Sequence, residues 1–179
     1  MLYNMAVEGL KSGQERVFAP DSMILTGGGS KSRTLPEDWE VDTRRFFGVE
    51  RVIHAYGMSE VLGGHIICRH GRYHLDPTQI LFVLDPDSGA VLPRHGVRTG
   101  RAAMYDLNNA CYWGGFISGD EITVDWDSRC PCGQLSAHMA PDISRYAQKG
   151  GGDDKISCAA ATDAHDSALD YLVDEPETH

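Results

Sequence analysis

Three polar side chains, Tyr56, Ser59 and Glu60, follow a short β-branched run that begins at Val52. The run predicts a buried strand, and Gly57 interrupts it. An aromatic ring at a strand end offers a face for stacking, a hydroxyl offers a hydrogen bond, and a carboxylate is a hard oxygen ligand suited to Mg²⁺. The pattern is compatible with a phosphate and metal edge, and the alternative is an ordinary turn.

A run of glycines, Gly27, Gly28 and Gly29, follows the apolar stretch 23–26. Glycine lets the backbone approach a ligand closely and leaves amide hydrogens free to bind it. The distance to Lys31 is too short for a Gly-x-x-x-x-Gly-Lys-Ser phosphate loop. The run therefore predicts either a backbone contact with a ligand or a flexible turn after a strand.

Four possible metal ligands occur in two short groups: Cys68, His74, Cys130 and Cys132. A Cys-x5-His group on one hairpin and a Cys-x-Cys group on a later loop can close a four-ligand zinc site between two β segments. His65 and His70 are alternative ligands. The other interpretation is a buried strand thiol and a plain Cys-Pro-Cys-Gly turn. If zinc binds, four protein ligands make its role structural.

The 179 residues predict one domain or slightly more, with an ordinary apolar share of 41%. A net charge of −10 disfavours nucleic acid or an anionic membrane as the main partner. No apolar run approaches the roughly 20 residues of a membrane span. The N-terminus lacks a signal-peptide pattern, so a cytoplasmic protein is expected. Five cysteines in a reducing compartment favour metal binding or a reactive thiol over disulfides.

The first third of the chain predicts an α/β arrangement. An N-terminal helix ends near Gly13, and a second helix spans 35–47, where acidic residues precede basic ones and Gly48 follows as a stop. Strands at 23–26 and 52–53 flank this second helix. Such a strand-helix-strand unit predicts a sheet whose strand ends form a ligand edge.

The rest of the chain, up to about residue 145, predicts a β-rich subdomain of short strands and turns. Two strands within 113–124 are expected to turn at Gly119 and Asp120. The other expected strands are 65–68, 73–75, 79–84 and 101–107.

The order of the short motifs resembles the adenylate-forming superfamily, and more narrowly the acyl-protein synthetase (LuxE-type) and phenylacetate–CoA ligase branch. The resemblance runs from about Ile24 to about Ala161. The motifs, in order, are Thr26-Gly-Gly-Gly-Ser-Lys31, Tyr56-Gly-Met-Ser-Glu60, Asp106-Leu-Asn-Asn109, Ser118-Gly-Asp120, Cys130-Pro-Cys-Gly133 and Asp153-Asp154. The resemblance implies a partial adenylate-forming fold of the α/β class, a short strand-helix-strand segment followed by a β-rich subdomain.

The resemblance also implies an ATP or AMP site with Mg²⁺. The backbone of Gly27, Gly28 and Gly29 would line the adenine pocket, with Gly57 at the adjoining turn. Tyr56 would stack on adenine, Ser59 would approach the α-phosphate, and Glu60 would help to hold Mg²⁺. Asp120 would accept hydrogen bonds from the ribose hydroxyls. In such a reaction the protein mainly positions two anions while a metal offsets their charge.

Three departures from the family pattern qualify the resemblance. The family's phosphate loop and acyl pocket lie upstream of the first strand of this chain. The hinge motif Gly-Arg-x-Asp does not occur at 149–155, and Arg145 is the nearest candidate for its arginine. The mobile domain with the catalytic lysine is essentially missing. We therefore expect 1–145 to form the distal part of the N-terminal domain, and 146–179 to form the hinge with a residual C-terminal segment and acidic tail.

Cys158 follows the glycine-rich segment and, by resemblance to LuxE-type proteins, would accept the acyl group from the adenylate. The alternative is a small buried thiol among alanines. The implied function is ATP-dependent activation of a fatty or aryl carboxylic acid, with transfer to a protein cysteine or CoA, within a longer or split enzyme. An upstream half-enzyme or an acyl reductase would be its partner. The competing hypothesis is a non-catalytic, zinc-stapled module.

Overall fold

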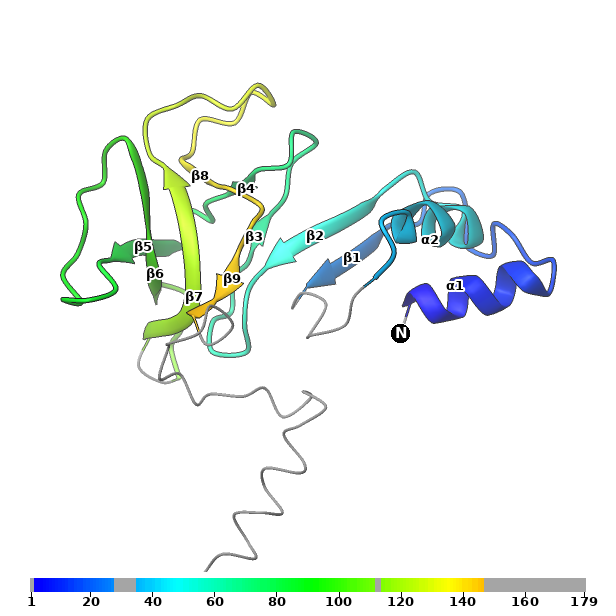
Figure 1. Cartoon of the computed structure of the whole chain (residues 1–179), viewed down its shortest axis with the longest axis horizontal. Coiled ribbons are helices and arrows are strands. Elements are labelled where there is room, and N and C mark those ends of the chain that lie inside the picture. Colours follow the sequence, from blue (N-terminus) through cyan, green and yellow to red (C-terminus); the bar gives the residue numbers. More distant parts are fainter. Residues whose placement is uncertain (1, 28–34, 112–113, 147–179) are drawn as a thin grey trace, which may run out of the picture.

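A computed structural model describes residues 2–27, 35–111 and 114–146 of the protein. Figure 1 shows two helices at one end, a large sheet at the other, and a small sheet between them. The elements are, in order, α1 (Leu2–Lys11), β1 (Ile24–Gly27), α2 (Trp39–Phe47), β2 (Val52–Tyr56), β3 (His65–Ile66), β4 (Tyr73–His74), β5 (Gln79–Leu84), β6 (Val97–Asp106), β7 (Gly115–Asp125), β8 (His138–Met139) and β9 (Ser144–Arg145).

The small sheet has the order β1-β2-β3, with β1 parallel to β2 and β3 antiparallel to it. Apolar residues of α1, α2 and the first two strands share one core, which includes Ala6, Ile24, Phe47 and Val52. Gly9 allows the two helices to approach closely, because a Cβ there would lie 1.9 Å from the Phe46 ring. This is the predicted strand-helix-strand unit.

Helix α2 begins later than the sequence predicts, at Trp39 instead of residue 35. The preceding residues form a turn in which the Trp39 N–H donates to the carbonyl of Pro36. The helix ends as predicted: Gly48 adopts a left-handed conformation with φ of 77°, and its N–H donates to the carbonyl of Arg44. The end of the helix was therefore predicted correctly, and its start was not.

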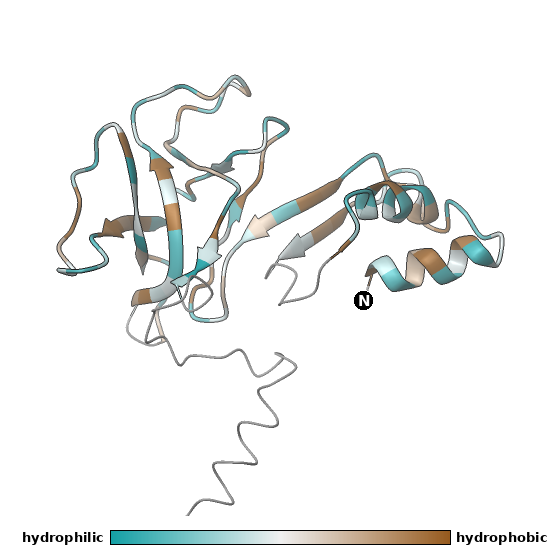
Figure 2. Cartoon of the chain, viewed as in Figure 1, coloured by the Kyte–Doolittle hydropathy of each residue, from teal (hydrophilic) through white to brown (hydrophobic). Residues whose placement is uncertain are grey.

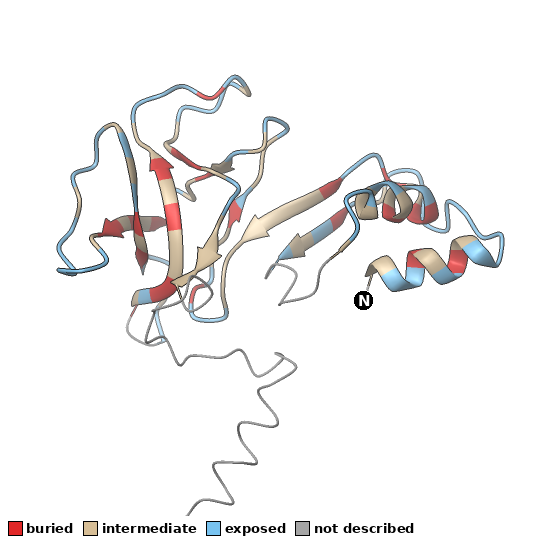
Figure 3. Ribbon diagram, viewed as in Figure 1, coloured by how far each residue is buried: buried red, intermediate tan, exposed pale blue. Residues whose placement is uncertain are grey.

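The large sheet holds the strands β4-β8-β7-β6-β5 in that order, and β9 also pairs with β7. Apolar and polar residues alternate along the last part of β7, 121–125 (Figure 2), as expected of a sheet with one face in a core. Buried residues recur along the strands of the large sheet (Figure 3). They include Leu81, Met104, Ile122, Val124 and Met139, each no more than 2% exposed. The predicted β-rich subdomain is thus confirmed, as is the α/β segment before it.

The predicted pair of strands within 113–124 is wrong, because β7 runs through Gly119 and Asp120 as one strand. Residues 118–120 of β7 lie opposite a single residue of β6, Ala102. A bulge of this kind accommodates extra residues without a turn and redirects their side chains. The Ser-Gly-Asp stretch therefore re-aims Asp120 instead of ending a strand.

No helix in the described part of the chain is long and apolar enough to cross a membrane.

Candidate functional site

Three residues from distant parts of the chain meet at the junction of the two sheets. The Tyr56 hydroxyl, at the end of β2, donates a hydrogen bond to Asp120 Oδ2 at 2.9 Å. The Arg145 guanidinium, on β9, lies with its Nε 3.5 Å from Asp120 Oδ1. Asp120 is thus held between a phenol and a cation, and all three residues are ones the sequence singled out. We call this group the Tyr56–Asp120–Arg145 cluster.

The bulge in β7 determines where Asp120 points. The Asp120 N–H donates to Ser118 Oγ at 3.1 Å, and the carbonyl of Ser118 accepts from Arg101 Nε at 2.6 Å. Asp120 pairs in register with Arg145 across β7 and β9. The Asp120 side chain is 14% exposed and that of Arg145 is 43% exposed, so the carboxylate is sheltered while a ligand can still reach the cluster.

Burial and the adjacent Asp120 charge raise the pKa of Tyr56 far above its usual value. The phenol therefore stays protonated and acts as a hydrogen-bond donor at any physiological pH. Its ring stacks on His65 at 6.0 Å between centroids. Burial lowers the pKa of His65, which keeps that imidazole neutral near pH 7. A flat, uncharged aromatic pair thus lies beside a carboxylate.

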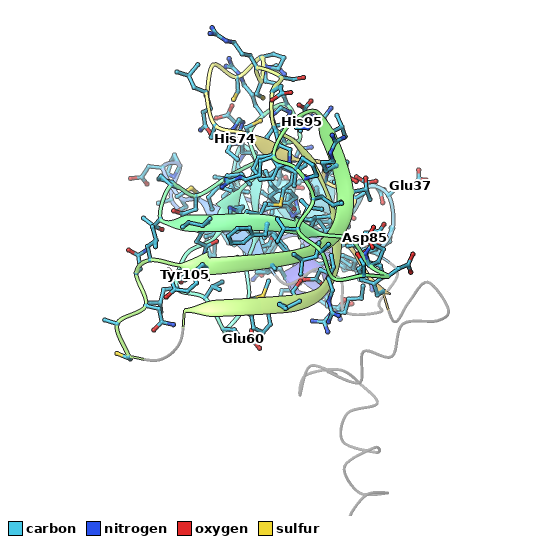
Figure 4. All side chains as sticks on the ribbon, turned by 90° about the vertical axis from the view of Figure 1, so that its left-hand side faces the viewer. Glu37, Glu60, His74, Asp85, His95 and Tyr105 are labelled. Carbon is cyan, nitrogen blue, oxygen red and sulfur yellow. The ribbon has the colours of Figure 1, made fainter. Side chains whose placement is uncertain are left out.

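Gly28 and Gly29, two other predicted nucleotide-site residues, lie outside the described residues. So does Cys158, the predicted acyl acceptor. Gly27 ends β1, which runs parallel to the β2 strand that delivers Tyr56. Gly57, Ser59 and Glu60 lie in the loop after β2. In Figure 4, Glu60 lies at the lower margin of the large sheet and His74 near the opposite end.

The four predicted metal ligands come together at that opposite end. The ligand atoms of Cys68, His74, Cys130 and Cys132 all lie within 4.8 Å of one another. Cys68 Sγ is 3.7 Å from Cys130 Sγ, and His74 Nε2 is 3.1 Å from Cys132 Sγ. Tetrahedral zinc with Zn–S bonds of about 2.3 Å needs ligand atoms roughly 3.7 Å apart, so the group fits zinc with small adjustments. We call it the Cys3His cluster.

Two similar turns present the thiols. The carbonyl of Cys68 accepts the Gly71 N–H, and the carbonyl of Cys130 accepts the Gly133 N–H. Both glycines, three residues after a cysteine, adopt the left-handed conformation, with φ of 69° and 94°. A side chain is strained there, so glycine suits these turns. The described structure thus gives a physical reason for both Cys-x-x-Gly spacings.

The electrostatics of the Cys3His cluster suit a cation. Burial and the neighbouring His138 lower the pKa of His74, and a neutral imidazole can bind a metal. Backbone N–H groups of His70 and Arg72 lower the pKa of Cys68 although its burial acts the other way. The pKa of Cys130 is raised: the Cys132 N–H opposes this, but burial and the adjacent sulfurs outweigh it. A dication would offset this crowding of thiols.

Neither alternative histidine joins the cluster. His65 is buried beside Tyr56, where its Nδ1 accepts the Asp76 N–H at 3.0 Å, and His70 contacts Cys68 only through its backbone N–H. The sequence reasoning missed Ser136, whose Oγ lies 3.0 Å from His74 Nδ1. That bond leaves Nε2 facing the thiols and fixes the ring, as outer partners of metal-bound histidines usually do. Nothing in the local sequence points to Ser136, because the pairing of β4 with β8 brings it to His74 from a distant part of the chain.

A groove of about 510 Å³ borders the Cys3His cluster and is lined in part by Cys68, His74 and Cys132. Solvent therefore reaches the cluster from one side. A metal ion could enter, and a chelator could withdraw it, without unfolding of the sheet.

Comparison with family models finds no match, and comparison with curated proteins also finds none. Solved structures do overlap part of the chain. MatB from Rhodopseudomonas palustris is 22% identical over 67% of this chain and 25% of its own, with a TM-score of 0.41.

Two other solved structures cover similar shares. A luciferase-like enzyme from the nonluminescent Zophobas morio mealworm is 17% identical over 68% of this chain and 30% of its own, with a TM-score of 0.44. A long-chain-fatty-acid–CoA ligase from Archaeoglobus fulgidus is 15% identical over 80% of this chain and 32% of its own, with a TM-score of 0.49. The chain spans about a quarter to a third of these longer proteins.

Proposed function

We propose that the protein carries the nucleotide edge of an adenylate-forming enzyme of the LuxE and phenylacetate–CoA ligase type. In this reaction a carboxylate attacks the α-phosphate of ATP, and an acyl-adenylate and pyrophosphate form. The acyl group then passes to a thiol, either CoA or a protein cysteine such as Cys158, as a thioester forms and AMP leaves. The acid is a fatty or aryl carboxylic acid.

The Tyr56–Asp120–Arg145 cluster is the observation that carries the proposal. Motif order selected Tyr56 and Asp120, and Arg145 is the nearest arginine to the expected hinge. The three residues lie 64 and 25 positions apart in sequence, and Tyr56 and Arg145 each contact Asp120 directly. A carboxylate has about four lone-pair sites, of which Tyr56 and Arg145 use part. The remaining sites can accept the two ribose hydroxyls of a nucleotide, while the Tyr56 ring offers a flat surface beside them.

The proposal gives each residue of this edge a role. Asp120 accepts hydrogen bonds from ribose, Tyr56 lies against adenine, and Arg145 orients Asp120 and adds positive charge near the phosphates. Ser59 approaches the α-phosphate, and Glu60 supplies an oxygen ligand to Mg²⁺, which would offset charge on the phosphates. The backbone at Gly27 borders the adenine pocket.

The proposal places 1–145 in the distal part of the nucleotide-binding domain and 146–179 in the hinge region. The phosphate loop and acyl pocket would come from an upstream half, fused or separate. That half is the expected protein partner, with an acyl reductase as a further candidate.

Carboxylate-dependent release of pyrophosphate from Mg·ATP tests the proposal. The assay combines the chain with fatty and aryl acids, with and without an upstream half that carries a phosphate loop. We expect release only in the combined reaction, and its loss in Asp120→Ala. No release in either reaction, together with no ATP binding by the chain, would contradict the proposal.

A second candidate role is a non-catalytic module stapled by zinc, and the Cys3His cluster favours it. The four ligands would fill a tetrahedral site completely, which is typical of structural zinc. Metal analysis of the purified protein decides this point. We expect one equivalent of zinc, lost in Cys130→Ser and retained in Cys111→Ser, which removes an exposed thiol outside the cluster. Metal-free wild-type protein would contradict this role.

A further inference from the structure

The loop between β2 and β3, residues 57–64, is fastened to the other sheet of the molecule. Ser59 and Glu60 lie in its first half, and Val61, only 6% exposed, enters the core of the large sheet. The second half of the loop makes its polar contacts with residues at the ends of β5 and β6. The position of Ser59 and Glu60 therefore depends on groups distant in sequence.

Asp106, the last residue of β6, supplies the main contact. Its side chain is only 1% exposed. Asp106 Oδ2 accepts the Leu62 N–H at 2.5 Å, and Oδ1 accepts the Asn108 N–H at 2.9 Å. These backbone donors, together with that of Gly63, lower the pKa of Asp106 although burial opposes them. An ionised carboxylate accepts several N–H groups and donates none, which suits it to this position.

Two neighbours close the contact from the other side. A Cβ on Gly63 would lie 2.7 Å from Gln79 Nε2 and 2.8 Å from Asp76 Oδ2, so only glycine fits without displacing them. Gln79 is 6% exposed and pairs in register with Asp106 across β5 and β6. Asp76 receives the Thr78 N–H and hydroxyl on its other oxygen.

We propose that Asp106 is a positioning residue that holds the 57–64 loop so that Ser59 and Glu60 face a nucleotide bound at Tyr56 and Asp120. The inference rests on the proposed function for the identity of the ligand. It adds a buried carboxylate that contacts no substrate and acts through the backbone of Leu62 and Gly63.

The loop contact is tested without any nucleotide. In Asp106→Asn an amide NH₂ group, which is a donor, replaces one of the two carboxylate oxygens that accept backbone N–H groups. We expect hydrogen exchange at the Leu62 amide to accelerate about tenfold or more, as the loss of a charge-assisted bond allows. Asp125→Asn is the matched control, because Asp125 likewise accepts the backbone N–H groups of Asp127 and Ser128, but in a distant turn. Unchanged Leu62 exchange in Asp106→Asn would overturn the proposal.

The functional consequence is tested by comparing two nucleotides. Glu60 would act only on Mg·ATP, through the metal, whereas Tyr56, Asp120 and Ser59, which approaches the α-phosphate, would contact AMP as well. We therefore expect Asp106→Asn to weaken Mg·ATP binding about tenfold and AMP binding by less than about threefold. General destabilisation would weaken both alike, and that result, like equal binding of Mg·ATP by variant and wild type, would overturn the positioning role.

Gly63→Ala provides a second variant if Asp106→Asn does not fold. It displaces the same loop from the opposite side and leaves Asp106 intact, so the same selective loss of Mg·ATP binding is expected. Failure of the wild-type chain to bind either nucleotide would overturn the proposed function, and with it the ligand named here. Leu62 exchange would still decide whether Asp106 holds the loop.

Discussion

The Tyr56–Asp120–Arg145 cluster and the Cys3His cluster are built in opposite ways. The Cys3His cluster uses two local turns, each with a cysteine followed by glycine three positions later, brought together by the pairing of β4 with β8. The Tyr56–Asp120–Arg145 cluster takes one residue from each of three strands, and it depends on a bulge and on the contact between two sheets. The first is specified by spacing and the second by topology.

The two clusters should therefore respond differently to perturbation. A metal would join two segments of the β-rich subdomain and contribute to folding itself. The Tyr56–Asp120–Arg145 cluster joins the small sheet to the large one and leaves carboxylate acceptor sites for a ligand. Damage to the first should lower stability, and loss of the Asp120 carboxylate from the second should lower ligand binding more than stability.

Removal of metal has the largest expected effect. Chelation of wild-type protein, or Cys130→Ser, should lower the thermal midpoint by more than about 10 °C, because a structural zinc contributes several kcal/mol to folding. Differential scanning calorimetry with and without chelator measures the shift. Cys111→Ser is the control and should change the midpoint by less than about 2 °C. An equal midpoint with and without chelator would mean that the four ligands do not staple the fold.

Tyr56→Phe has an intermediate expected effect. The variant keeps the ring and loses the hydroxyl that donates to Asp120, so the free energy of unfolding should fall by about 1–3 kcal/mol. AMP affinity should stay within about threefold, because the stacking surface remains. Chemical denaturation and calorimetric titration measure the two quantities. Loss of AMP binding with unchanged stability would show that the hydroxyl, and not the ring, recognises the ligand.

The smallest expected effect is the loss, at acidic pH, of the stability that Asp106 contributes. Because the folded pKa of Asp106 lies below its usual value of 3.8, its contribution to stability is present above about pH 4 and is lost as the pH falls through the folded pKa. The difference in unfolding free energy between wild type and Asp106→Asn should therefore be constant from pH 7 to about pH 4.5 and shrink below that. Urea titrations across this range measure it. A difference that grows on acidification would have the wrong sign for an ionised Asp106.

The sequence predicted elements and local sites better than it predicted their connections. The end of α2 at Gly48 and the full extent of β5 follow from local signals, namely glycine after basic residues and a run of apolar residues. Spacing also predicted that the four residues of the Cys3His cluster come together. These features depend on neighbours in the chain, which the sequence displays directly.

The features that were missed depend on tertiary contacts. A Gly-Asp pair normally marks a turn, yet Gly119 and Asp120 lie in a bulge because β6 continues alongside them. Asp106 opens one of the motifs of the resemblance, but its contact with the 57–64 loop is not visible in the sequence. Ser136 approaches His74 only through the pairing of β8 with β4. In each case the decisive partner lies far away in sequence.

The most direct test is nucleotide binding at Asp120. Calorimetric titration of AMP into wild type, Asp120→Asn and the control Asp87→Asn, which alters an exposed turn, measures it. Wild type and Asp87→Asn should bind AMP with equal affinity, and Asp120→Asn should bind at least about tenfold more weakly, since the amide loses acceptor capacity and charge. Equal AMP affinity in Asp120→Asn and wild type, or no binding by wild type, would contradict a nucleotide edge at the Tyr56–Asp120–Arg145 cluster.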